Sequence, residues 1–315
     1  RARGAVFDLP DADGTVQPFG VITLPAFYGP AEWRTQAVAA KRPLAEIDRD
    51  AAAAVEQLST IAVKPDPRDA EMWGLRRQFL SRQLAALRSR VAMLQGARLT
   101  FDEESKALYD AVAPVKPESE FAGVVAQLSA VLPGDGPLIE RYDRFKQQFV
   151  IPTNRLDRVF QQAIRACRER TPGVNLPLQE RFTVEYVTNK AWGGYNWYQG
   201  NFKSLIQVNT DLPVYIDRAI DLACHEGYPG HHVYNALLEK TLVKDRGWIE
   251  YTVYPLFSPQ SLIAEGTANY GIDVAFPLPS RLAFERDVLF AIAGLNPDRV
   301  AEYYTVLGLV QRLSY

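Results

Sequence analysis

All three histidines of this 315-residue chain lie in one eight-residue stretch, HEGYPGHH, at residues 225–232. They are His225, His231 and His232, and Glu226 directly follows the first of them. Imidazole nitrogens and carboxylate oxygens are the donors of catalytic Zn2+ sites, in which three protein ligands leave the fourth position for water. A chain that places its whole histidine supply beside a glutamate therefore indicates a metal site rather than separate structural histidines.

The spacing departs from the common helical zinc motif HExxH, in which the two histidines lie four residues apart. Here the fourth position after His225 is Pro229, and the seventh is His232. Along an unbroken helix seven residues span about 10.5 Å. Zn–N bonds of about 2.0–2.1 Å cannot bridge that gap, so the helix must break for two histidines to share an ion.

The Pro-Gly pair inside the motif supplies the break. Proline cannot donate to the helical ladder, and the two glycines nearby permit unusual dihedrals. We therefore expect the helix to end or bulge after Glu226 and to restart near His231. This bulge would place His231 where the second histidine of HExxH stands. We favour His231 as the second ligand and keep His232 as the alternative.

A third ligand is expected on the following helix. Ser258-Pro259 predicts a helix start, with a capping serine and a proline at the first position. Glu265 follows within apolar surroundings, where a lone buried carboxylate is costly without a cation. Gly266 beside it would allow another backbone to approach closely. The alternative is that Glu265 is a partly exposed residue of an amphipathic helix.

The elements around the motif predict a mainly α protein of the α+β class. We interpret residues 1–29 as an irregular entry segment and the next 140 or so as helical, including helices at 68–96 and 153–170 and a capping box at Thr100–Glu103. Three strands follow, at 181–188, 193–200 and 203–210, and we expect an antiparallel meander just before the metal-binding helix. The chain is divided into a helical lobe, 1–172, and a catalytic lobe, 173–315.

Composition excludes several classes of protein. The net charge of −2 gives no electrostatic case for nucleic acid or an anionic membrane, and no apolar run reaches the length of a membrane span. We expect a soluble protein, cytoplasmic or exported after processing, of open oligomeric state. Cys167 and Cys224 are too few for a disulfide framework, and two buried free thiols are expected in preference to one bridge.

The string HEGYPGHH followed by AEGTANY resembles a bacterial family that is catalogued as a domain of unknown function and regarded as zinc metallopeptidases with an HExxPGHH motif. IQVNTDLP at 206–213 and VQRLSY at 310–315 are similar to further segments of that family. The resemblance covers residues 180–315. It implies a gluzincin-like cleft, bound Zn2+, and a native chain that continues past Tyr315. Thr267 and Ile272 depart from the family pattern near Glu265.

These observations predict a zinc peptidase with His225, His231 and Glu265 as ligands and Glu226 as general base. Strand 203–209 would bind an extended peptide along its edge, with contacts from Gln207 and Asn209. Donors that stabilise the developing negative charge are sought across the cleft, and the candidates are His232, Tyr270 and Tyr315.

Two other functions use the same residues. One is a metal-dependent hydrolase of a non-peptide amide or ester, which would differ only in its pocket. The other is a non-catalytic helical binding protein, in which the three histidines and Glu265 hold a structural metal with four protein ligands.

Overall fold

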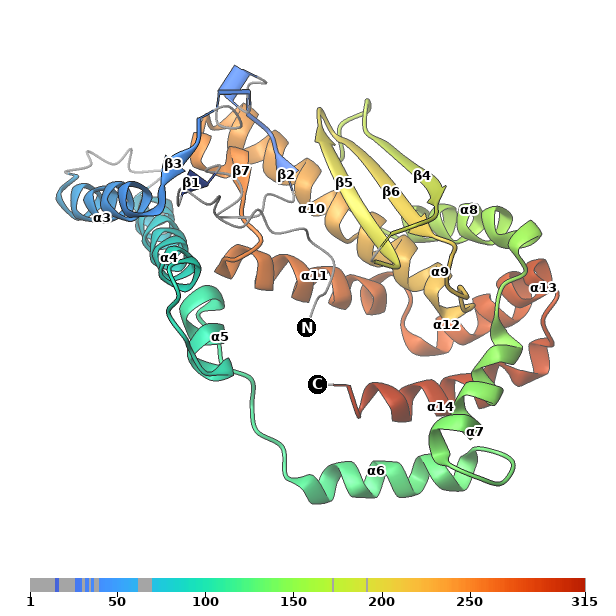
Figure 1. Ribbon diagram of the computed structural model, residues 1–315. Helices are drawn as coiled ribbons and strands as arrows, with labels where there is room; N and C mark the ends of the chain where they lie inside the picture. The colour runs from blue at the N-terminus through green and yellow to red at the C-terminus, as the bar shows by residue number, and fades with distance from the viewer. Residues whose placement is uncertain are drawn as a thin grey trace.

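The computed structural model describes residues 15–16, 26–29, 32–33, 35–36, 40–61, 70–171, 173–190 and 192–314. Within these ranges the chain is mainly helical, with a small mixed sheet that precedes the HEGYPGHH segment (Figure 1). The predicted fold class is confirmed. Most of the entry segment 1–29 lies outside the described residues, and two short strands fall within its described part.

Helices occupy most of the chain on both sides of the sheet. The α-helices are α3 (Leu44–Thr60), α4 (Ala70–Leu94), α5 (Phe101–Tyr109), α6 (Glu118–Val131), α7 (Leu138–Lys146), α8 (Thr153–Glu169), α9 (Asp217–Leu222), α10 (His231–Leu237), α11 (Pro259–Ala275), α12 (Leu278–Phe284), α13 (Phe290–Ala293) and α14 (Val300–Gln311). The π-helical turns are η2 (Ala223–Gly227), η3 (Leu238–Asp245) and η5 (Glu285–Leu289), and the 3-10 turns are η1 (Gln147–Phe149), η4 (Ile249–Thr252) and η6 (Pro297–Arg299). The strands are β1 (Thr15–Val16), β2 (Ala26–Phe27), β3 (Arg42–Pro43), β4 (Arg181–Val187), β5 (Gly194–Gly200), β6 (Lys203–Asn209) and β7 (Val253–Tyr254).

Local sequence signals place several of these elements correctly. Thr100 caps α5 in a capping box in which Glu103 returns a hydrogen bond to the Thr100 backbone. Helices α4 and α8 lie within the predicted ranges 68–96 and 153–170. The three predicted strands are present as β4, β5 and β6.

The antiparallel meander is wrong. The strand order is β4-β6-β5-β2-β7, with β5 antiparallel and β4 parallel to β6. Asn201 and Phe202, both with positive φ, form the tight turn between β5 and β6, as type I′ hairpins require. Strand 203–209 is therefore an interior strand and cannot take a peptide along its edge.

Pairing from distant parts of the chain explains this order. Strand β2 pairs in parallel with β5 and antiparallel with β7, which lies more than fifty residues after β5 in the chain. The far side of β5 is thus occupied in part, and β4 pairs with the free side of β6. Local alternation of apolar residues predicts strands, but it carries no information on such partners.

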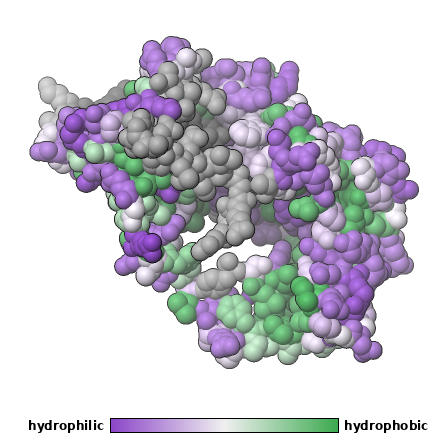
Figure 2. Space-filling model, viewed as in Figure 1, coloured by the Kyte–Doolittle hydropathy of each residue, from purple (hydrophilic) through white to green (hydrophobic). Residues whose placement is uncertain are grey.

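One large apolar core joins α6–α8 to the elements that carry the motif. It includes Phe149, Phe160, Ile206, Ile220 and Phe290, which come from both sides of residue 172. The division into lobes at 172 stays a prediction. On the surface, Figure 2 shows apolar residues gathered over α6 and α14 on an otherwise mostly polar face.

The two cysteines are joined, so the expectation of free thiols is wrong. Cys167 of α8 and Cys224 of η2 form a disulfide with a Cα–Cα distance of 5.6 Å. Both residues are fully buried in the large core, where α8 packs against η2. The two cysteines are 57 residues apart along the chain, and no local pattern indicates that these helices meet.

Among the described residues, none of the helices is both long and apolar enough to cross a membrane.

Candidate metal centre

The helix break in HEGYPGHH occurs where the sequence predicts it. Helix α9 passes into the π-helical turn η2, which ends at Gly227, and α10 begins at His231. The Tyr228–Pro229 peptide bond is cis. The amide of Gly230 donates to the carbonyl of Cys224 at 2.9 Å, which folds the chain back onto the preceding turn. The Nε2 atoms of His225 and His231 consequently lie 3.1 Å apart.

Gly230 is required for this return. A Cβ atom at this position would lie 1.8 Å from the carbonyl oxygen of His225 and 2.4 Å from that of Cys224. Both contacts are to backbone, so no rotamer change relieves them. The absence of a side chain at Gly230 therefore allows the start of α10 to lie close to the turn that carries His225.

Glu265 completes a group of three donors. It lies on α11, whose N-terminus is capped by Ser258 and has Pro259 at its first position, as predicted. Its Oε1 lies 3.2 Å from Nε2 of His231, and its Oε2 lies 3.4 Å from Nε2 of His225. The side chain is 50% exposed, so Glu265 borders open space on the side away from the histidines.

The expectation that Gly266 admits a neighbouring backbone is wrong. A Cβ atom at Gly266 would meet nothing within 4 Å. Gly266 faces away from the packed side of α11. The sequence did not reveal this, because apolar residues of α11 such as Leu262 and Ile263 are also exposed and hide which side of the helix is packed.

The electrostatics of the three groups are coupled. Burial alone would raise the pKa of Glu265, but hydrogen bonds from His225 and His231 hold it well below its usual value. Burial lowers the pKa of His225, but Glu265, Glu226 and Asn269 together raise it above its usual value. Two imidazole nitrogens and a carboxylate that face one another need a positive charge between them, either a proton or a cation.

Asn269 orients the first histidine. Its Oδ1 lies 3.0 Å from Nδ1 of His225, one helical turn beyond Glu265 on α11. An amide oxygen only accepts, so Nδ1 is the nitrogen that donates to Asn269, and in the neutral imidazole the Nε2 lone pair then faces His231 and Glu265. This is the arrangement that a ligating histidine needs, with its second nitrogen held by an oxygen.

Glu226 also borders the group. One ligand atom each from His225, Glu226 and His231 all lie within 4.8 Å of one another. The backbone carbonyl of Glu226 accepts from the side-chain amide of Asn196 on β5 at 2.9 Å, which ties the turn to the sheet. Because the oxygens of Glu265 lie closer to the two imidazole nitrogens, we assign Glu265 to the donor triangle and Glu226 to its border.

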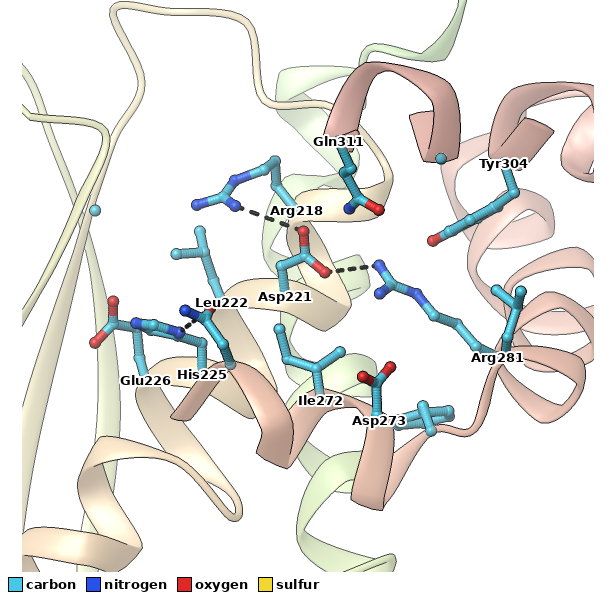
Figure 3. Close-up of a pocket in the computed structure, with 15 residues that line it drawn as sticks. Arg218, Asp221, Leu222, His225, Glu226, Ile272, Asp273, Arg281, Tyr304 and Gln311 are labelled. Atoms are coloured by element: carbon cyan, nitrogen blue, oxygen red, sulfur yellow. Dashed lines mark hydrogen bonds and ion pairs between the residues drawn. The ribbon is translucent and has the colours of Figure 1, made fainter. Parts of the chain in front are cut away.

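Two pockets meet at these residues. The larger is a cleft of about 590 Å3 between η2, α11, α12 and α14, and Asn269 is among its lining residues. His225 and Glu226 line the end shown at the left of Figure 3. The smaller, about 230 Å3, lies against β5 and is lined by both histidines, Glu226, Glu265 and several uncharged residues. Glu226 and His225 line both pockets, so the donor triangle lies where they join.

His232 does not face this centre. It is fully buried, with Nε2 2.8 Å from Oε2 of Glu180 and Nδ1 2.8 Å from the hydroxyl of Ser204. Tyr228 also donates to Glu180, and Arg168 pairs with it. His232 therefore anchors α10 to the sheet, and the expectation that it contacts substrate is not supported by its position.

Three other predicted residues lie away from the donor triangle. Gln207 bonds Trp197 and Glu185 on the sheet surface, and Asn209 is buried and accepts from the amide of Asp211. Tyr270 is 69% exposed on α11 and lines neither pocket. Tyr315 lies outside the described residues.

Tyr195 is a residue that the sequence did not single out. It lies on β5 in the smaller pocket, and its hydroxyl makes no hydrogen bond to another described residue. Burial raises its pKa, and the nearby carboxylates of Glu226 and Glu265 raise it further, so the phenol keeps its proton. The sequence carried little indication of Tyr195, because GGYNWYQG has five aromatic or amide side chains in a row and nothing distinguishes one of them as a site residue.

Comparison with protein-family models, with curated proteins and with solved structures finds no match to this chain.

Proposed function

We propose that this protein is a zinc-dependent hydrolase that cleaves peptide bonds, with His225, His231 and Glu265 as the metal ligands. The supporting observation is the donor triangle formed by these three side chains: the two Nε2 atoms lie 3.1 Å apart, and each faces a different oxygen of the Glu265 carboxylate, Oε1 at 3.2 Å from His231 and Oε2 at 3.4 Å from His225. Tetrahedral zinc with bonds of about 2.0–2.2 Å holds neighbouring donors about 3.3–3.5 Å apart. The three side chains thus already stand at the separations that one ion requires.

The number of donors favours a catalytic ion over a structural one. Structural zinc is usually closed by four protein ligands, whereas catalytic zinc keeps one position open. His232, the expected fourth ligand of a structural site, is bound to Glu180 and Ser204 instead. The remaining side of the triangle borders the pockets.

The residues around the triangle supply acid–base chemistry. Zinc at this position would lower the pKa of water to about 7 and polarise a carbonyl group. Glu226 stands next to a ligand and lines both pockets, where it can take a proton from the attacking water and return it to the leaving amine. The protonated hydroxyl of Tyr195 is the donor available to the developing oxyanion.

An edge of β5, rather than of β6, suits an extended peptide. β5 pairs with β6 along its length, whereas within the described part of the chain its pairing with β2 is limited to Tyr198. Gly194, Tyr195 and Asn196 line the smaller pocket beside the donor triangle. Backbone groups at this end of β5 can add a peptide as a further strand and lay a carbonyl near Glu226.

Metal content and hydrolysis test the proposal together. Purified protein should hold about one equivalent of zinc, and His225→Ala should hold almost none, as elemental analysis would report. A peptide library should be hydrolysed in preference to a panel of small amides and esters. Preference for the panel would favour the non-peptide hydrolase.

Glu226→Gln separates the base from the ligands. Because the amide cannot accept the proton, we expect activity to fall by about 10²–10⁴-fold while zinc content is unchanged. Peptide hydrolysis that persists in this variant with metal bound would overturn the assignment of Glu226.

A further inference from the structure

The larger cleft begins at His225, one corner of the donor triangle, and extends along α9 and α11. On η2 and α9, His225, Leu222, Asp221 and Arg218 are spaced so that they share one helical face, and all four line the cleft. On α11, Asn269, Ile272 and Asp273 continue the line from Glu265 in the same way. Both helices therefore extend the site away from the histidines.

The far end of the cleft is walled by other helices. Arg281 of α12 and Tyr304 and Gln311 of α14 lie on the side away from His225 (Figure 3), and Gly308 of α14 is also among the lining residues. Helices α12 and α14 therefore bound the cleft on the side away from His225. Such a cavity suits the end of a chain better than its middle.

Most of the lining charges are already neutralised by one another. Arg281 is buried, with Nη2 2.8 Å from Asp221 and Nε 3.0 Å from Glu285. Arg218 lies 3.5 Å from the second oxygen of Asp221. Each of the two arginines is thus paired with at least one carboxylate. Arg218 can still donate hydrogen bonds to peptide carbonyl groups, but its positive charge is already matched by Asp221.

Asp273 is different, because no described residue forms an ion pair or hydrogen bond with its carboxylate. Figure 3 shows this carboxylate turned into the cleft between Ile272 and Arg281, on the opposite side from Arg218. The charge that the cleft leaves unmatched at this end is therefore negative, and the complementary group on a ligand is a cation.

We propose that the larger cleft binds the protonated amino end of a peptide substrate, with Asp273 as the partner of the amine. This inference rests on the proposed peptidase function and adds a substrate class to it. Eight residues of α11 separate Glu265 from Asp273, about 12 Å along the helix. An extended peptide spans about 3.3–3.6 Å per residue, so two or three residues fit between the amine and the scissile carbonyl. The products are di- or tripeptides from the amino end.

Binding to the zinc-supplemented Glu226→Gln chain tests the amine without relying on turnover. The probes are tetra-alanine, its N-acetylated form and acetyl-lysyl-trialanine, measured by calorimetry. We expect tetra-alanine to bind about ten-fold more tightly than the acetylated form, as a hydrogen bond between charged groups allows. Equal binding of the two would overturn the proposal, and tight binding of the lysyl peptide would assign the site to a side-chain amine instead.

Substitution of Asp273 provides the matched test. Asp273→Asn should weaken the binding of tetra-alanine about ten-fold and leave the affinity for the acetylated peptide unchanged. Asp143→Asn, an exposed carboxylate of α7 that lines neither pocket, is the control and should change neither. An Asp273→Asn variant that binds tetra-alanine as tightly as the parent chain would contradict the role of this carboxylate.

Two results separate this inference from the proposed function. If the active chain hydrolyses free and acetylated peptides at equal rates, the peptidase stands and the amine site fails. If no peptide is hydrolysed but tetra-alanine binds selectively through Asp273, the amine site stands and the peptidase fails. Mass spectrometry of an octapeptide digest would report the length of the released fragments. Initial cleavage far from the amino end would overturn the proposal that di- or tripeptides are released from that end.

Discussion

At the scale of single residues, two adjacent histidines have separate roles. His231 turns to His225 and Glu265, whereas His232 turns to Glu180 and Ser204. Neighbouring residues of a helix point about 100° apart, so at the start of α10 one imidazole can face the donor triangle while the next contacts the sheet. The sequence favoured His231 but could not find Glu180 as the partner of His232.

Metal content distinguishes the two histidines. We expect His231→Ala to lose almost all bound zinc, because it removes one corner of the donor triangle. His232→Ala should keep the zinc stoichiometry but lower the free energy of unfolding, because Glu180 loses a buried partner. Elemental analysis and urea denaturation measure the two effects, and loss of zinc from His232→Ala with an intact fold would contradict the assignment.

At the scale of elements, the turn between η2 and α10 decides whether a centre exists at all. Proline and glycine in the motif predict a break, and the break is present. The π-helical turn and the return of Gly230 to Cys224 depend on the backbone path, which residue types alone do not specify. The helix start located Glu265, and its half-exposed side chain matches the alternative of a partly exposed residue rather than a buried one.

Gly230→Ala tests this turn. Its Cβ would lie 1.8 Å from the carbonyl oxygen of His225, so the two histidines must move apart. We expect zinc affinity to fall by at least ten-fold and stability to fall as well. Gly266→Ala is the matched control: open space surrounds the new methyl group, and alanine should stabilise α11 by about 0.5–1 kcal/mol. Unchanged zinc affinity in Gly230→Ala would show that the turn does not set the spacing.

Glu180 links α10 to the start of β4 and gives stability a dependence on pH. Burial would raise its pKa, but hydrogen bonds from His232 and Tyr228 and the charge of Arg168 lower it below its usual 4.5. A carboxyl whose pKa is lower in the folded state stabilises the fold above its unfolded value and loses that contribution as the pH falls.

The corresponding variant is Glu180→Gln. At pH 7 we expect its free energy of unfolding to be about 2–3 kcal/mol lower than that of the parent chain, because the charge-assisted hydrogen bonds are lost. The difference should narrow progressively as the pH falls below 4.5. Urea denaturation from pH 7 to pH 3 measures it, and a difference that is constant over this range would exclude the ionised form as its source.

At the scale of the whole molecule, the disulfide joins the helical segment that precedes the sheet to the centre. Cys167 lies on α8, and Cys224 directly precedes His225. Closing a loop of this length restricts the unfolded chain, a contribution of about 4 kcal/mol in the chain-entropy description. The bond therefore stabilises the packing of α8 against η2, the turn that carries His225.

Reduction tests this contribution. We expect a reductant to lower the free energy of unfolding by about 2–4 kcal/mol. The double variant Cys167→Ala, Cys224→Ala should not respond to reductant, which controls for other effects of the reagent. Two titratable thiols in the native, unreduced protein would contradict the bond.

The sequence by itself determined the composition of the centre: which residues could bind an ion, that the helix must break between them, and that a helix beginning at Ser258 brings a glutamate. These conclusions rest on local physics, namely helical spacing, proline and capping. Only the tertiary structure decided the partners, because strand order, the disulfide, the burial of His232 and the place of Asp273 in the larger cleft depend on how segments far apart in the chain pack together. Such contacts are selected by the packing of the whole core, which no short stretch of sequence contains.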